Sequence, residues 1–183
     1  MRKFVITLVS FILIFLAVLV VFSEKSNIVR AQVDIRGDSV EYTLPFAGIL
    51  PDSPLYYVKT IRDNFWLFFT RDNMKKAEVL LLFSDRKTSA AQLLSKNGKW
   101  EKSAEIMLEA EGHFKKMTEM VLLSKNQGVS PEDSFVLTLK QSNKKHREVI
   151  EELLGNTPQG TRKVLEDTLE LNSSLAEKLN ESF

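Results

Sequence analysis

Cysteine is absent from this 183-residue sequence, and the residues that break helices are scarce, with 7 glycines and 5 prolines. Without cysteine, disulfides, thiolate catalysis and thiolate metal sites are all excluded. The low glycine and proline content leaves room for long, uninterrupted helices. Neither sign of charge is in excess: the net charge is +1, and basic and acidic residues are interleaved. Because no basic face stands out, nucleic acid is not an expected partner.

Histidine is also scarce, which narrows the choice of metal and acid–base sites. The two histidines are His113 and His146, and Glu109 lies one helical turn before His113. A di-iron bundle would need acids at positions 110 and 143, where the chain has Ala110 and Asn143. We therefore expect no metal site. His113 is expected to be a solvated edge residue, and the basic residues next to His146 disfavour a cation there.

Motifs of the common catalytic mechanisms are missing too. The sequence has no Gly-x-Ser-x-Gly elbow and no glycine-rich phosphate loop. Its carboxylates are plentiful, but they fall on the polar faces of expected helices, where solvation is their ordinary role. The sequence therefore predicts a protein that is not an enzyme, with no catalytic residues and no cofactor.

The N-terminus contains the longest apolar run. Arg2 and Lys3 precede residues 4–22, which carry no charge. As a helix this run would be roughly 28 Å long, about the thickness of the hydrocarbon layer. The basic flank predicts a cytoplasmic N-terminus, with the rest of the chain outside the cell membrane. Residues 1–22 are therefore expected to be a transmembrane anchor or a signal segment. Because removable signals have shorter apolar cores of ~7–15 residues, a retained anchor is favoured; cleavage would give a secreted protein.

Residues 23–51 are expected to form an extended spacer that ends in a segment rich in proline and glycine. Removing Arg2 and Lys3 from the 25 basic residues leaves 23 outside the anchor, against 24 acidic residues. Attraction of this part to anionic lipid should therefore be weak. The prolines cannot continue a helix, whereas Asp52 or Ser53 can cap the next helix, with Pro54 at its first position. The residues that define this Pro/Gly segment are Pro45, Gly48, Pro51, Asp52, Pro54 and Tyr56.

Apolar residues at three- and four-residue steps predict five long helices in residues 52–183. Their expected ranges are 54–69, 73–96, 100–125, 131–154 and 158–180. Glycines at 98 and 128 provide stop signals, and Asp72 provides a cap for the second helix. Because the connections are short, successive helices should be antiparallel neighbours. The expected fold is all-α: an N-terminal membrane helix followed by an extracytoplasmic up-and-down bundle.

The first of these helices carries an apolar stripe at Leu55, Val58, Ile61, Phe65 and Phe68, which predicts a buried face. Its last turn, residues 65–69, is apolar all round. The favoured interpretation is that this turn lies in the middle of the domain. The alternative is a surface that meets a partner or the membrane interface, where tryptophan is favoured. The residues of this possible interaction surface are Phe65, Trp66, Phe68, Phe69 and Trp100.

Residues 44–59 read LPFAGILPDSPLYYVK, and Arg62-Asp63 follows them. This stretch resembles the start of a bacterial domain family of unknown function, in which an LPxxGxLPDSPLYxxK motif follows an N-terminal membrane segment. Further similarity is found at residues 68–78, 90–98 and 145–149. The resemblance implies an exported, membrane-tethered helical domain, and it brings no catalytic residues.

Two functions from different classes remain open. The first is a non-enzymatic, membrane-tethered domain that acts in protein–protein interaction or envelope structure, with a protein partner or self-association. The second is a binding module for an apolar or cell-wall-derived ligand, with Trp66, Phe69 and Trp100 as candidate walls. The absence of any catalytic constellation and the apolar residues 65–69 favour the first.

Overall fold

The computed structural model describes residues 42–183, and residues 1–41, including the expected anchor, lie outside the described part. The described residues form five α-helices and a short 3₁₀ turn, without strands, which confirms the expected all-helical bundle. The elements are α2 (Tyr56–Phe69), α3 (Asn73–Lys96), α4 (Trp100–Asn126), α5 (Asp133–Asn156), η1 (Gln159–Thr161) and α6 (Arg162–Ser182). Within residues 42–183, no helix combines the length and the apolar character that crossing a membrane requires.

Helix ends follow the capping signals in the sequence with shifts of at most two residues, except that α6 begins at Arg162 rather than at 158, because η1 precedes it. Asp72 caps α3 by accepting a hydrogen bond from the backbone N–H of Lys75 at 2.8 Å. Gly98 and Gly128 have φ angles of 73° and 85°, so each takes the left-handed conformation that ends a helix. The first helix begins at Tyr56 rather than Pro54, because a turn closed by Ser53 N–H on Leu50 O precedes it.

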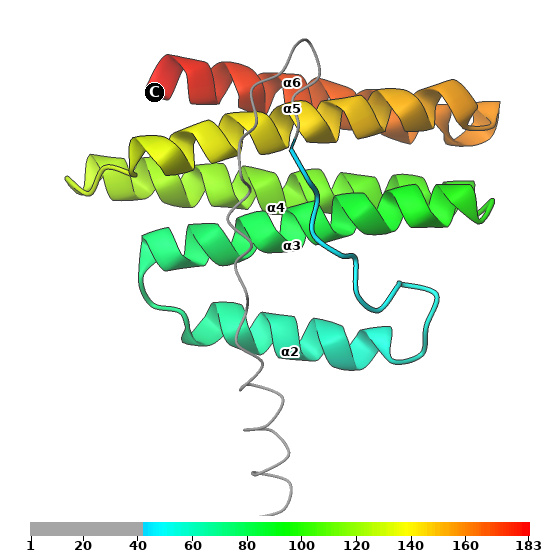
Figure 1. The fold of residues 1–183 in the computed structure, drawn as a ribbon, viewed down its shortest axis with the longest axis horizontal. Coiled ribbons are helices and arrows are strands. Elements are labelled where there is room, and N and C mark those ends of the chain that lie inside the picture. Colours follow the sequence, from blue (N-terminus) through cyan, green and yellow to red (C-terminus); the bar gives the residue numbers. More distant parts are fainter. Residues whose placement is uncertain (1–41) are drawn as a thin grey trace, which may run out of the picture. The chain divides into compact units, whose positions relative to one another are not determined.

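Figure 1 shows that successive helices run in opposite directions. The expectation that all successive helices are neighbours was wrong for α4 and α5, which scarcely touch. α3 packs on α4, α4 on α6, α6 on α5, and α5 on α3, so these four helices close a bundle around a common core. α2 lies outside this bundle, along α3. The four-helix bundle is therefore complete without α2.

The core of the bundle is divided into two apolar clusters by a layer of buried polar residues. One cluster is built around Leu94, Met107 and Ile150, and the other around Phe114, Met117 and Leu139. Between them lies the polar layer, whose main members are Asp85, Glu111, Ser142, Asn143, His146 and Asn172, each at most 5% exposed. Such a layer fixes how far each helix can slide along its neighbours, because any slide would bury unpaired polar groups.

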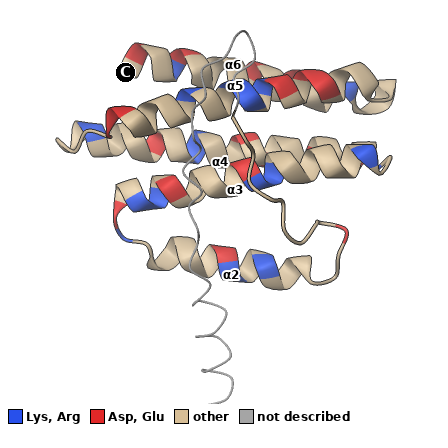
Figure 2. Cartoon of the chain, in the orientation of Figure 1, with Lys and Arg blue, Asp and Glu red and all other residues tan. Residues whose placement is uncertain are grey.

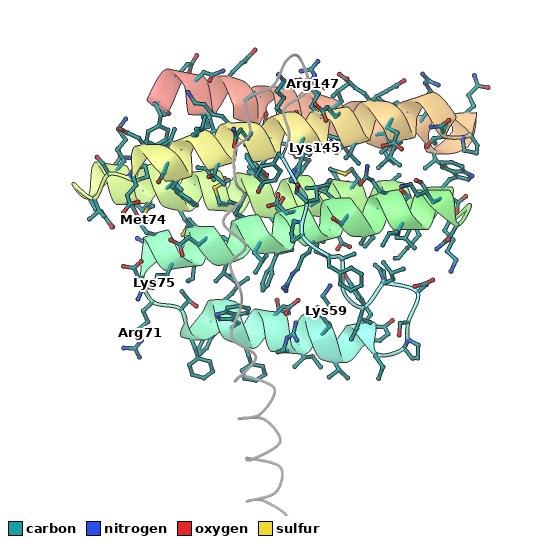
Figure 3. The ribbon with its side chains drawn as sticks, viewed as in Figure 1. Lys59, Arg71, Met74, Lys75, Lys145 and Arg147 are labelled. Carbon is teal, nitrogen blue, oxygen red and sulfur yellow. The ribbon has the colours of Figure 1, made fainter. Side chains whose placement is uncertain are left out.

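The side of α2 that faces the bundle is the reverse of the expected one. Leu55, Val58, Ile61, Phe65 and Phe68 are between 53% and 78% exposed. α2 instead turns Tyr56, Lys59 and Trp66 toward α3, as Figure 3 shows for Lys59. The expectation of a buried stripe, and of a central position for residues 65–69, was wrong. The reason is that α3–α6 already fill the core. The periodicity of α2 correctly indicates an apolar face, but no other helix covers that face.

The Pro/Gly segment lies on the bundle rather than away from it. Ala47 is 1% exposed and belongs to the first apolar cluster, against which Leu44 and Leu50 also pack. The hydroxyl of Ser89 in α3 donates a hydrogen bond to the carbonyl of Pro45 at 2.7 Å. Residues 42–51 are thus attached to the bundle through both apolar and polar contacts.

The cap of α3 gives a first prediction. Asp72→Ala should lower the free energy of unfolding by about 1 kcal/mol, because the N–H of Lys75 loses its acceptor. Urea denaturation of the full chain measures the change. Asp133→Ala is the matched control: Asp133 lies in the first turn of α5 and is not its N-cap. Equal losses in the two variants would contradict the capping role of Asp72.

Candidate functional site

The polar layer is centred on His146 of α5, which lies between two carboxylates. Its Nδ1 is 2.7 Å from Glu111 Oε1 on α4, and its Nε2 is 2.9 Å from Asp85 Oδ1 on α3. The three side chains are 0–5% exposed. Because carboxylates only accept hydrogen bonds, both ring nitrogens must donate, and this requires the imidazolium form.

The protonation of His146 reflects two opposed effects. Burial alone would lower the pKa of His146, because a dry environment disfavours the charged ring. The hydrogen bonds to Asp85 and Glu111, together with their negative charges, outweigh this effect and raise the pKa to about 9. The expectation that His146 would not carry a charge was therefore wrong. Its basic sequence neighbours are on the helix surface, whereas its spatial neighbours are two acids from other helices.

Further hydrogen bonds extend the layer to α6 and to Tyr42, the first described residue. Tyr42 donates its hydroxyl proton to Asp85 Oδ2 at 2.6 Å, and Ser142 donates to Asp85 Oδ1 at 2.6 Å. On the other side, the amide groups of Asn143 in α5 and Asn172 in α6 each donate to the other's backbone carbonyl, at 3.2 and 3.1 Å. Burial and the adjacent Asp85 charge raise the pKa of Tyr42, so its hydroxyl stays a donor.

Ser142, His146 and Glu111 lie at distances like those of a catalytic triad of nucleophile, base and acid, but their hydrogen bonds differ from those of a triad. Ser142 Oγ lies 3.5 Å from His146 Nε2, but it donates its proton to Asp85. A protonated His146 cannot accept a proton from Ser142, and Ser142 is 0% exposed, so no substrate reaches it. Nor do the acids converge on a metal position, since they lie at opposite nitrogens of one ring. Within residues 42–183, no group of three or more acids and histidines could hold a metal ion.

Periodicity indicated part of this layer. Glu111, His146 and Asn172 fall on the inner faces of their expected helices, and the structure buries all three. Asp85 was expected, like the other carboxylates, on the polar face of its helix. The signal that could have found it is its spacing of four residues from Leu81, which is also buried.

A second candidate site is the outward side of α2. We call it the α2 apolar face, and it consists of Leu55, Tyr57, Val58, Ile61, Phe65, Phe68 and Phe69, each between 53% and 78% exposed. Its aromatic rings are already ordered against each other: Phe65 stacks on Phe69 with centroids 6.2 Å apart, and Phe68 meets Phe69 edge-on at 5.4 Å. Figure 2 shows that charged residues are sparse along α2 compared with the other helices.

The structure brings only part of the expected interaction surface together. Phe65, Phe68 and Phe69 lie on the α2 apolar face, but Trp66 points toward α3 and meets the ring of Phe83 edge-on at 6.0 Å. Trp100 begins α4 and lines a separate open groove of about 580 Å³ with Asp52 and other polar residues. Trp66 and Phe69 do not line this groove, so the three expected walls of a ligand site are not assembled.

The inner side of α2 is polar and encloses a small cavity. Lys59 donates to the carbonyls of Ala47 and Ile49 at 3.2 and 3.5 Å, and Lys87 of α3 donates to the hydroxyl of Tyr56 at 2.9 Å. The cavity beside them holds about 50 Å³, room for water rather than for an apolar ligand. α2 is therefore attached to the bundle by hydrogen bonds at its first turns and by the apolar contacts of Trp66 and Leu67 near its end.

His113 borders this cavity, and its environment also differs from the expected one. Its Nδ1 is buried without a hydrogen-bond partner, and its ring meets Phe83 edge-on at 6.1 Å. Burial, followed by the charges of Lys87 and Lys116, lowers the pKa of His113 to about 4. His113 is thus a neutral, half-buried residue, which excludes the solvated position but not the edge position among the two that were expected.

The motif residues of the Pro/Gly segment act as supports. Gly48 has a φ angle of 70°, which favours glycine at that turn. Asp52 forms an ion pair with Lys99 just before α4, and Tyr56 receives the hydrogen bond of Lys87. Pro45 offers its carbonyl to Ser89. Together these contacts position the start of α2 on the bundle.

The pH dependence of stability tests the charge of His146. Its pKa is about 9 in the folded protein and about 6.5 in the unfolded chain, so its contribution is complete below pH 6.5 and is lost as pH rises through 9. The free energy of unfolding should fall by about 3 kcal/mol over this window, at ~1.4 kcal/mol per pKa unit. Urea denaturation at a series of pH values measures the fall.

His113 supplies the control for that experiment, because its effect has the opposite sign and a different window. A pKa lowered to about 4 makes stability decline as pH falls from 6.5 to 4. With two histidines in the sequence, NMR should show one ring titrating near pH 9 and one near pH 4, and His113→Gln assigns them. Two rings titrating near pH 6.5 would contradict the buried imidazolium.

The attachment of Tyr42 can be measured separately. Tyr42→Phe removes the donor to a buried carboxylate and should lower the free energy of unfolding by roughly 1.5–3 kcal/mol. Tyr57→Phe removes the same hydroxyl from a residue that is 77% exposed, and its effect should stay within about 0.5 kcal/mol. Urea denaturation of both variants decides the point: equal effects would show that the Tyr42–Asp85 hydrogen bond does not hold the segment.

Comparison with known proteins agrees with this picture of a domain without assigned chemistry. No curated protein and no solved structure matches the chain. One family profile matches residues 48–160, and its description is a domain of unknown function (DUF5667). The match runs from the Pro/Gly segment to η1 and includes Asp85, Glu111 and His146, while Tyr42 and Asn172 lie outside it. Because the match spans more than half of the sequence, this chain belongs to the DUF5667 family.

Proposed function

We propose that this protein is a non-enzymatic helical domain, tethered to the outside of a bacterial cell membrane, that acts in protein–protein interaction through the α2 apolar face. The observation that carries the proposal is the exposure of seven large apolar side chains on one side of a helix whose only contribution to the two core clusters is the partly buried Leu67. An apolar patch of this kind on a soluble domain is typical of an interaction surface.

The tether is supported by the sequence. Residues 4–22 are uncharged and long enough to cross a bilayer, and basic residues precede them. The described chain begins with a segment that is attached to α3 and leads directly into α2. α2 is therefore the first helix after the spacer, and its orientation is set by the same residues that connect the spacer to the bundle.

The absence of an enzymatic role is supported by the state of the acid–base groups. The polar layer contains the acids and the histidine with the most perturbed surroundings, and all of them are sealed from solvent. Each has hydrogen-bond partners within the bundle. These groups therefore stabilise and align helices. Among the described residues, the exposed large apolar side chains are concentrated on α2.

Site-specific photo-crosslinking in cells that produce the full chain tests the proposal. A photoreactive amino acid at position 68, on the α2 apolar face, should give an adduct with a protein. The same amino acid at position 137 is the matched control, because Leu137 of α5 is also apolar and 49% exposed. Phe65→Glu should abolish the adduct and leave the unfolding midpoint within a few degrees of that of the parent, since Phe65 contributes little to the core.

Two results would contradict the proposal. Equal adducts at positions 68 and 137 would show random collision rather than docking. The lack of any protein adduct at position 68, with the chain folded and produced at normal levels, would show that the α2 apolar face does not meet a protein.

A further inference from the structure

The size of the α2 apolar face is the starting point. Seven large side chains that are on average about two-thirds exposed, at ~200 Å² for a fully exposed large side chain, present roughly 900 Å² of apolar surface. The largest apolar patch of a typical monomer is about 300–600 Å², whereas each partner of a standard protein interface buries about 800 Å². The α2 apolar face therefore has the area of one half of a stable interface.

The distribution of charge on α2 favours a copy of the same face as the partner. Of the charged residues of α2, Lys59 is turned toward the bundle and binds two backbone carbonyls, whereas Arg62 borders the face and pairs with Asp63 at 3.0 Å. Two identical α2 faces can thus meet without bringing two unpaired cations together. In a twofold interface the same patch is used by both partners, so the patch must be complementary to a copy of itself.

A bilayer surface fits the same face less well. An interfacial helix normally presents lysine and arginine on its polar side to lipid headgroups. In α2 that side faces α3, and Lys59 is held by the carbonyls of Ala47 and Ile49. Outside residues 1–22 the chain has 23 basic and 24 acidic residues, so a general attraction to anionic lipid is missing as well.

The shape and order of the face also suit helix packing. α2 has 14 residues, so it presents a short rod of roughly 21 Å without proline or glycine inside it. The rings of Phe65, Phe68 and Phe69 contact each other, and these contacts reduce the side-chain freedom that remains to be lost on binding. Ile61 and Phe65 lie nearest the middle of the helix on the outward side, where two crossing helices come closest.

We propose that the α2 apolar face is a twofold interface between two copies of this chain, with the two α2 helices packed across Ile61 and Phe65. This inference rests on the proposed function, because it names the partner for the same surface. The dimer would join two four-helix bundles through their α2 helices and leave the polar layer of each bundle unchanged.

Because the sequence has no cysteine, single substitutions give a direct test in the full chain. Ile61→Cys and Phe65→Cys should each form a disulfide-linked dimer on mild oxidation of cells, since residues at a twofold crossing approach the ~6 Å Cα separation that a disulfide needs. Lys163→Cys, exposed on α6, is the matched control and should remain monomeric. Adding Phe68→Glu to Ile61→Cys should lower the dimer fraction at least about tenfold.

The remaining outcomes separate this inference from the proposed function. If the α2 cysteines do not crosslink while position 68 gives an adduct with a different protein, the second copy is ruled out and docking on α2 stands. If position 68 gives adducts with lipid only, both proposals fail. If Lys163→Cys forms as much dimer as Ile61→Cys, the disulfides reflect collision, and the twofold interface is rejected.

Discussion

The rest of this structure depends on one interaction: a protonated histidine that donates a hydrogen bond to each of two buried carboxylates. His146, Asp85 and Glu111 come from three different helices, and each satisfies a hydrogen bond that the others would otherwise leave open. Replacing such a group by apolar residues would not necessarily weaken the bundle, because burying charge is costly. An apolar replacement would instead lose the register of the helices, that is, their alignment along the bundle axis. An all-apolar core tolerates sliding of its helices, whereas the present core has a single alignment in which the three side chains meet.

Much of the helical framework could be predicted from the sequence, because its determinants are local. Asp72, Gly98 and Gly128 are capping residues whose effect needs no knowledge of distant parts. The pairing of His146 with Asp85 and Glu111 joins residues 61 and 35 positions apart, and no local pattern contains that information. The prediction of which side of α2 is buried was wrong for a related reason. An apolar stripe indicates which residues share a face, but only the completed bundle decides whether that face is covered.

The two parts of the described chain are held by different forces. α3–α6 surround two apolar clusters and a buried, hydrogen-bonded polar layer in which Asn172 Oδ1 is left without a partner. α2 has no fully buried side chain of its own, and it is attached through Lys59, Tyr56, the edge contact of Trp66 with Phe83 and the partly buried Leu67. The exposed apolar side chains of α2 and the buried residues of the core are therefore separate sets.

The hydrogen bond from Tyr42 to Asp85 has a mechanical consequence. Tyr42 is the first described residue, and its hydroxyl reaches the same carboxylate that holds His146. Tension applied through the preceding chain would therefore load the centre of the bundle before it reached α2 or the helix ends. The side chain of Ala47 and the Ser89–Pro45 hydrogen bond share that load a few residues later. A pull on residue 42 would thus be resisted by a hydrogen bond in the buried polar layer, not only by contacts on the surface of the bundle.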